Sequence, residues 1–259
     1  MNDEDDGVTD GLPDAPPRRQ RDDLRRPDDE AEPAGAPAKR GGVLREAVVV
    51  LASALVLSIL IKTFLVQAFF IPSGSMEQTL EVGDRVLVSK LAPGPLDVHR
   101  GDVVVFVDPG GWLGEPPPDT RNVLQRGAEN VLTFIGLLPH NAGEHLIKRI
   151  IGVGGDTVAC CDAEGRLTVN GEGIDEPYLH PGVSPSDTEF ERLVPEDHVW
   201  LMGDNRSNSQ DSRAHQGRAG GGAVPMGNVV GKAFVVLWPV DSWGLLRNPG
   251  DVFAEVPEP

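Results

Sequence analysis

An uncharged apolar run from Ala47 to Ile61 constrains this chain of 259 residues more than any other feature. It reads AVVVLASALVLSILI, and after Lys62 the apolar character continues to Ile71. A helix needs about 20 apolar residues to cross the hydrocarbon core of a bilayer. Residues 44–66 supply that length if the Lys62 amine extends to the interface. We therefore predict one transmembrane helix over residues 44–66.

Two other interpretations of the run are a cleaved signal peptide and a buried core helix. Residues 66–68, VQA, resemble a small-residue cleavage site. However, more than 40 residues of acidic, proline-rich chain precede the run, where a signal peptide carries a short basic region. Nothing after residue 71 looks helical enough to wrap a core helix. The sequence therefore favours an uncleaved anchor.

The segment before the helix, residues 1–43, is predicted to be a disordered tail. Residues 1–42 carry 12 Asp or Glu, 7 Lys or Arg and 6 Pro, and such a segment cannot bury enough apolar surface to offset its chain entropy. Lys39, Arg40 and Arg45 precede the apolar run. By the positive-inside rule, the tail therefore lies in the cytoplasm, the chain crosses the plasma membrane once, and residues 67–259 lie outside. The net charge of −17 argues against a nucleic-acid partner.

Residues 67–259 have the pattern of a mainly β domain. Short apolar runs are bounded by Gly, Pro and Asp, and Asn170-Gly171 is a strong hairpin signal. Nothing alternates strand with helix, so we expect an antiparallel sheet. Residues of about 109–145 interrupt the pattern as an inserted smaller region, whose apolar piece 131–138 either covers the core or touches lipid. Strands are expected at residues 85–89, 102–107, 146–153, 166–170, 198–202 and 229–238.

The two cysteines, Cys160 and Cys161, are adjacent in the sequence. A bridge between them requires a strained eight-membered ring, and two thiols are too few ligands for a structural zinc. We therefore expect two small side chains on opposite faces of a strand. The cysteine content does not decide the compartment.

Ser75 follows the apolar run closely, and Lys148 lies in the apolar sequence LIKRII. A serine hydroxyl becomes a good nucleophile only when a base takes its proton. The six histidines are scattered, without metal-ligand spacing, but a lysine can be the base if burial lowers its pKa. Strand alternation places Lys148 and Ile150 on one face. Taken singly, Ser75 is typical of a turn and Lys148 of a solvated strand.

Residues 203–213, GDNRSNSQDSR, form a dense polar loop after the predicted strand 198–202. Its acids and amides resemble a calcium loop, but Arg206 and Arg213 would repel a cation. An Asp211–Arg213 pair, with several small hydroxyls, suits a rigid support for a serine–lysine pair.

Four ordered segments of this chain resemble the sequence boxes of the bacterial type I signal peptidases. These are membrane-bound serine proteases of peptidase family S26, which remove signal peptides from exported preproteins. The resemblance covers residues 64–240, and its motifs together are highly specific. The four segments are 71–80 (IPSGSMEQTL), 83–90 (GDRVLVSK), 148–156 (KRIIGVGGD) and 203–213.

This resemblance implies that Ser75 is the nucleophile and Lys148 the general base. It also implies that the Ser73 hydroxyl joins the Ser75 backbone N–H in an oxyanion hole and that Ser209 orients Lys148. The residues that would hold the loop are Asp211 and Arg213, and those that would line pockets for small substrate residues at positions −1 and −3 are Phe69, Ile71, Leu80 and Ile147.

The chain departs from the family at Gln78, where proline is usual, and at Gly154, where proline often stands. Both bear on loop stiffness rather than on the reacting atoms. The resemblance implies cleavage after Ala-x-Ala without metal or cofactor, with signal peptides and the lipid bilayer as partners, near the secretion translocon. Two rival hypotheses are a soluble self-cleaving Ser-Lys repressor, which lacks an anchor, and a membrane-tethered β domain that only binds peptides or envelope partners.

Overall fold

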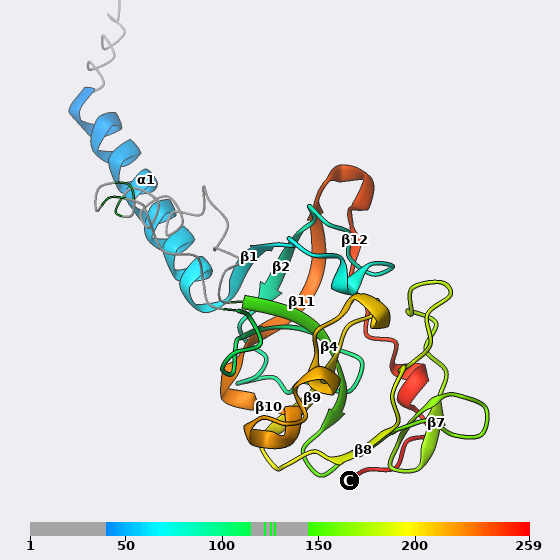
Figure 1. The fold of residues 1–259 in the computed structure, drawn as a ribbon. Coiled ribbons are helices and arrows are strands. Elements are labelled where there is room, and N and C mark those ends of the chain that lie inside the picture. Colours follow the sequence, from blue (N-terminus) through cyan, green and yellow to red (C-terminus); the bar gives the residue numbers. More distant parts are fainter. Residues whose placement is uncertain (1–39, 115–121, 123–124, 126, 128–144) are drawn as a thin grey trace, which may run out of the picture. The chain divides into compact units, whose positions relative to one another are not determined.

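The computed structural model describes residues 40–114, 122, 125, 127 and 145–259. Its first element is helix α1 (Arg40–Phe64; Figure 1). Within α1, residues 45–64 are long and apolar enough to cross a membrane, and none of that stretch is buried inside the protein. A core helix would be mostly buried, so this exposure argues against the core-helix interpretation. The predicted helix, 44–66, overlaps α1 but extends two residues beyond its end.

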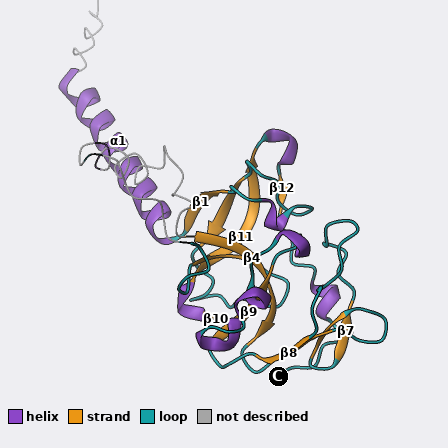
Figure 2. Ribbon diagram, in the orientation of Figure 1, coloured by secondary structure: helices purple, strands orange, loops and turns teal. Residues whose placement is uncertain are grey.

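The remaining elements are mainly antiparallel strands, which confirms the expected fold class (Figure 2). One sheet has the order β1-β2-β11-β3-β4-β9-β10, with β12 paired to β11, and a second sheet has the order β7-β6-β5-β8. The strands are β1 (Val66–Phe70), β2 (Arg85–Ser89), β3 (Val103–Val107), β4 (His145–Val153), β5 (Thr157–Cys160), β6 (Leu167–Val169), β7 (Glu172–Ile174), β8 (Phe190–Leu193), β9 (His198–Met202), β10 (Val224–Pro225), β11 (Val229–Trp238) and β12 (Gly244–Leu245).

The six predicted strands correspond to β2, β3, β4, β6, β9 and β11, with ends that agree to within one residue. The hairpin signal at Asn170-Gly171 is also confirmed, because these residues join β6 to β7 with φ values of 52° and 83°. Such positive φ values at two successive residues are typical of a tight hairpin turn. The sequence did not predict β1, which continues the apolar run, nor the short strands β5, β7, β8, β10 and β12.

Strand β3 lies at the centre of the large sheet, and both of its faces are buried. Val103 and Val105 pack into one apolar cluster, with side chains of β1 and β2, whereas Val104 and Phe106 pack into another cluster on the opposite face. A third cluster joins β5, β6 and β8 of the small sheet to Trp200 of β9. The sheet centre is therefore rigidly packed on both sides, and strand β4 pairs directly with β3.

The expectation for the cysteines was wrong, because Cys160 and Cys161 form a disulfide. Strand β5 ends at Cys160, so Cys161 lies outside the strand and does not alternate with it. Cys160 is buried at the end of β5, whereas Cys161 is exposed.

Two predicted regions fall largely outside the described residues. Of the predicted tail, 1–43, only residues 40–43 are described, and they belong to α1. The predicted insert, 109–145, is described only at residues 109–114, 122, 125, 127 and 145, and its apolar piece 131–138 is not described. Both remain predictions from the sequence.

Candidate active site

Ser75 lies in η1 (Gly74–Met76), a single 3-10 turn that follows β1. Its neighbour Met76 and the nearby Leu80 have no exposed surface, and the Leu80 N–H donates to the Met76 carbonyl over 2.8 Å. These buried apolar anchors fix the turn that carries the hydroxyl. Ser75 itself is 6% exposed. The carbonyl of Ser75 accepts the Asn205 N–H at 3.1 Å, so the polar loop 203–213 also holds this turn.

Lys148 lies in the middle of β4, where it pairs with the fully buried Val104 of β3. Its side chain is 3% exposed. The Nζ atom lies 2.6 Å from Ser75 Oγ and 3.0 Å from the Ile147 carbonyl oxygen. The structure thus brings together the two side chains that the sequence selected, although they are separated by 73 positions.

Burial lowers the pKa of Lys148 from 10.5 to about 8, because an ammonium group loses hydration inside the protein. The negative charges of Asp211 and Asp204 act in the opposite direction. At pH 7 about one molecule in ten therefore holds this amine neutral. A neutral amine has the lone pair that a general base needs.

The polar loop 203–213 is organised by the Asp211 carboxylate. Burial would raise the pKa of Asp211, but hydrogen bonds and charge from Arg213, together with the Gly203 N–H, lower it below its ordinary value. Arg213 donates from Nε at 2.9 Å and from Nη2 at 2.8 Å, and the Gly203 N–H donates at 3.0 Å. The expected Asp211–Arg213 pair is thus present, and Asp211 carries a buried negative charge toward Lys148.

Ser209 does not make the hydrogen bond to Lys148 that the resemblance implied. Its Oγ atom is buried, and the Ser209 side chain interacts with the Asp211 carboxylate, whose pKa it helps to lower. The Lys148 amine instead bonds to Ser75 and to the Ile147 carbonyl. The Ser209 hydroxyl remains close to the site, since it and the Ser75 carbonyl oxygen both lie within 2.5 Å of the position of a Cβ atom on Gly203.

A buried ion pair next to Lys148 was missed by the sequence reasoning. Arg149 donates to Asp204 from Nε at 2.9 Å and from Nη2 at 2.6 Å, and its guanidinium lies 4.0 Å from the centre of the Tyr178 ring. Thr79 donates its hydroxyl to the same carboxylate at 2.5 Å. One signal was available, because a buried arginine within an apolar strand requires a carboxylate partner.

A second buried pair joins the polar loop to the segment between β7 and β8. Arg206 donates from Nη1 to Glu176 Oε2 at 2.9 Å, and its Nη2 atom pairs with Glu176 Oε1. The Tyr178 hydroxyl donates to the same carboxylate at 2.8 Å. No local pattern predicts this pairing, because Glu176 follows another acidic residue and is 30 positions from Arg206 in the chain.

An apolar cavity of about 130 Å³ opens beside Lys148. Of the predicted pocket residues, Phe69, Ile71 and Ile147 line it, and so does the exposed Ser73. Leu80 does not line this cavity and is fully buried in the apolar cluster that contains Val103 and Val105 of β3. The cavity wall is completed by Phe70, Pro72, Val105, Leu113, His145, Leu146 and Lys148.

Gln78 has a φ of 89°, in the left-handed region. A proline ring fixes φ near −65°, so proline would not fit this backbone. Glutamine at this position is therefore compatible with the backbone of this chain, whereas proline is not. Within the described residues, no group of three or more His, Cys, Asp or Glu side chains could hold a metal ion.

Comparison with known proteins places these features in a family. Residues 44–238 match the family described as "Signal peptidase, peptidase S26". A signal peptidase I from Mycobacterium tuberculosis is 42% identical over 232 residues, which cover 82% of this chain and 78% of that protein. A probable signal peptidase I from Mycobacterium leprae is 37% identical over 233 residues, 80% of each chain. A crystal structure of a signal peptidase I from Enterococcus faecalis is 24% identical and covers 53% of this chain and 97% of that one, with a TM-score of 0.33.

Proposed function

Because this chain belongs to the peptidase S26 family of signal peptidases, we propose that it is a membrane-anchored serine endopeptidase that removes signal peptides from exported preproteins. The observation that carries the catalytic part of the proposal is the contact of 2.6 Å between Lys148 Nζ and Ser75 Oγ. Both groups are buried, and no histidine is among the hydrogen-bond partners of the Ser75 hydroxyl in the described residues.

In the first half of the reaction, the neutral Lys148 amine accepts the proton of the Ser75 hydroxyl. The Ser75 oxygen then attacks the carbonyl carbon of the −1 residue, and the carbonyl electrons move onto the oxygen. As the peptide C–N bond breaks, Lys148 returns the proton to the leaving amine. The products of this half are the mature protein and an acyl-enzyme on Ser75. Water activated by the same amine then hydrolyses the ester.

The oxyanion is proposed to bind the Ser75 N–H and the Ser73 hydroxyl. Ser75 lies in the first turn of η1, where N–H groups have no carbonyl partner within the helix. Ser73 precedes η1 and lines the cavity beside Lys148. One such donor typically lowers the barrier by about 2.7–4 kcal/mol.

Ser209 is proposed to act after proton transfer, when Lys148 carries a third N–H. That proton needs an acceptor, and the buried Ser209 hydroxyl, which interacts with Asp211, has oxygen lone pairs that can accept it. Hydrogen bonds in catalytic sites often form only in the substrate complex. A turn of this hydroxyl toward Lys148 would orient the charged amine.

The cavity beside Lys148 supports cleavage after small residues such as Ala-x-Ala. The lining by Phe69, Ile71 and Ile147 is apolar and so suits a small uncharged side chain such as that of alanine. Edge strand β1 supports binding of the signal-peptide end as an added strand, because an edge strand has unpaired backbone groups.

The lipid bilayer is proposed as the second partner, with α1 as a single-pass anchor of the plasma membrane, the tail 1–43 in the cytoplasm and residues 67–259 outside. Anchoring confines enzyme and membrane-held substrate to one surface and so raises their effective concentration. The same reasoning places the enzyme near the secretion translocon, where its substrates emerge.

The tip of the β11–β12 hairpin supports contact of the domain with lipid. Trp238, Val240, Trp243 and Leu245 are 53%, 64%, 71% and 66% exposed. Tryptophan favours membrane interfaces because its ring is both apolar and polar. Brominated lipids should therefore quench the fluorescence of the wild-type protein in vesicles, and the Trp238→Phe/Trp243→Phe variant should lose most of that quenching. Equal quenching in both proteins would reject this contact.

The test of the proposed function is cleavage of a labelled precursor by the purified full-length protein in detergent. N-terminal sequencing of the product should give a cut after a small residue. Ser75→Ala and Lys148→Met should each abolish cleavage while the circular dichroism spectrum stays unchanged. Residual turnover in either folded variant would reject the dyad, and no cleavage by the wild type would favour a membrane-tethered binding domain. Recovery of the protein in the soluble fraction would favour the repressor hypothesis.

A further inference from the structure

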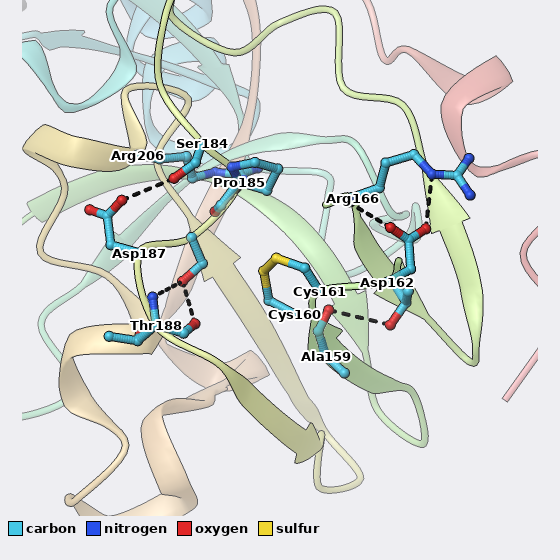
Figure 3. The surroundings of a disulfide bond; sticks show 12 residues. Ala159, Cys160, Cys161, Asp162, Arg166, Ser184, Pro185, Asp187, Thr188 and Arg206 are labelled. Atoms are coloured by element: carbon cyan, nitrogen blue, oxygen red, sulfur yellow. Dashed lines mark hydrogen bonds and ion pairs between the residues drawn. A yellow bond between two sulfur atoms is a disulfide. The ribbon is translucent and has the colours of Figure 1, made fainter. Parts of the chain in front are cut away.

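The disulfide between Cys160 and Cys161 lies at the surface of the small sheet and has no part in the proposed reaction. Figure 3 shows the bond together with the ion pair of Asp162 and Arg166 and with residues of the segment before β8. Both cysteines line an open cavity of about 410 Å³, and Cys161 is exposed. A small thiol can therefore reach the bond.

The charges around this cavity favour an uncharged or positively charged reductant. Asp162, Glu189 and Glu191 line it, and Glu189 and Glu191 are exposed. Carboxylates repel every attacking thiolate at short range, but they repel a reductant that carries further negative charge more strongly than one that is otherwise uncharged.

Strand pairing connects the disulfide to the segment before β8. Cys160 pairs with Phe190, the first residue of β8. Residues 184–188, which precede β8, form a compact turn in which Ser184 bonds to Asp187 at 2.9 Å and Ser186 bonds to the Thr188 carbonyl at 2.8 Å. A change in backbone conformation at Cys160, the end of β5, therefore acts on β8, the strand that follows this turn.

The same turn contacts the polar loop of the active site. The carbonyl of Pro185 accepts Arg206 Nη1 at 2.9 Å and Arg213 Nη1 at 3.5 Å. Arg213 in turn holds Asp211, whose charge acts on Lys148. Strand pairing, the chain from Phe190 back to Pro185 and these hydrogen bonds thus connect the disulfide to Asp211, whose charge acts on Lys148. Figure 3 includes Pro185 and Arg206 among the residues around the bond.

We propose that Cys160–Cys161 is a reversible thiol-exchange site whose reduction slows the catalytic step, an inference that rests on the proposed function. A reductant thiolate attacks the sulfur of Cys161, the S–S bond breaks, and the electron pair leaves on the Cys160 sulfur, which takes up a proton. A second thiol of the reductant resolves the mixed disulfide and frees Cys161. Two electrons enter the protein, and the reductant leaves as its own disulfide.

Reduction opens the eight-membered ring that the disulfide closes between the adjacent Cys160 and Cys161, so the backbone at the end of β5 gains freedom. The turn 184–188, which precedes the paired strand β8, and its contacts to Arg206 and Arg213 then become less ordered. Coupling through such a contact network typically changes a rate by about 2- to 30-fold. The decrease should appear in kcat, while KM for the precursor stays constant, because the cavity residues 69–73 and 145–148 belong to the large sheet and its adjoining turn.

The test compares the full-length protein before and after treatment with dithiothreitol, a neutral dithiol, followed by iodoacetamide. Mass spectrometry should find no carbamidomethyl group on protein treated with iodoacetamide alone and two after reduction and alkylation, with kcat lowered by about 2- to 30-fold. The matched control is Cys160→Ser/Cys161→Ser, which should have the kcat of the reduced protein and no response to dithiothreitol. Hydrogen exchange should increase at residues 184–188 and 203–213 on reduction but not at β2.

Cleavage by the untreated protein establishes the proposed function independently of this inference. An unchanged kcat after complete reduction would overturn the redox inference alone, and so would an equal loss of rate in the double serine variant on adding dithiothreitol. If the double variant does not fold, recovery of kcat on reoxidation of the reduced, unalkylated protein supports the inference, and lack of recovery contradicts it.

Discussion

Gly203 lies where the polar loop meets the main chain of Ser75, and we predict that Gly203→Ala damages the active site. A Cβ atom at this position would lie 2.5 Å from the Ser75 carbonyl oxygen. It would also contact Ser209 Oγ, which can rotate away, and lie 2.6 Å from Ser209 Cβ, which cannot. The Ser75 carbonyl matters most, because it belongs to the backbone that carries the nucleophile. The backbone of Gly203 has an ordinary φ, so the effect is purely steric.

The size of the effect follows from this distance. Ordinary van der Waals contact begins at 3.4 Å, so the Ser75 carbonyl or the loop must move by about 0.9 Å. A displacement of about 1 Å in an active site can lower the rate about 100-fold. We therefore expect a kcat about 100-fold below that of the wild type, with the domain still folded.

The assay is steady-state cleavage of a labelled precursor by full-length protein in detergent, with circular dichroism to monitor folding. The matched control is Gly227→Ala, because a Cβ atom on Gly227 meets nothing within 4 Å. Its kcat should equal that of the wild type. A Gly203→Ala variant that keeps a kcat within about twofold of the wild type would refute the packing argument.

Three further predictions concern the side chains around this loop. Lys148→Met should raise the free energy of unfolding at pH 7 by up to about 3 kcal/mol, because the folded protein binds the Lys148 proton less tightly than the unfolded chain does. Denaturant titrations should show that this gain in stability shrinks as the pH rises from 8 toward 10.5. No gain at pH 7 would contradict the buried amine. Arg149→Met should lower the free energy of unfolding by about 3–5 kcal/mol, since Asp204 stays buried without its partner, and a loss below about 1 kcal/mol would argue against the pair. Ser209→Ala should lower kcat by about 10- to 100-fold, the effect of one hydrogen bond to a charged group, whereas wild-type turnover would exclude Ser209 from orienting Lys148.

The sequence predicted the fold class and the longer strands because their apolar patterns are local. It also selected Ser75 and Lys148, since a serine close to a membrane-length run and a lysine within an apolar strand are both visible in the chain. The structure adds their contact of 2.6 Å and the burial that lowers the lysine pKa. The roles of these residues in catalysis remain predictions for the experiments above.

What the sequence could not predict depends on pairing between distant segments. Strands β7 and β8 have only three and four residues, and they form because β6 and β5 supply their partners. The Arg206–Glu176 pair likewise has no local signal, because 30 positions separate its members. The cysteines were mispredicted because strand alternation was extended one residue beyond the end of β5.

The measurement that tests the central claim most directly is the pH dependence of single-turnover cleavage with enzyme in excess. Burial lowers the pKa of Lys148 to about 8, so the amine is charged below this pH and neutral above it. The rate should therefore rise about tenfold per pH unit up to about pH 8 and then level off. A rate that stays constant from pH 6 to pH 10 would contradict a lysine base.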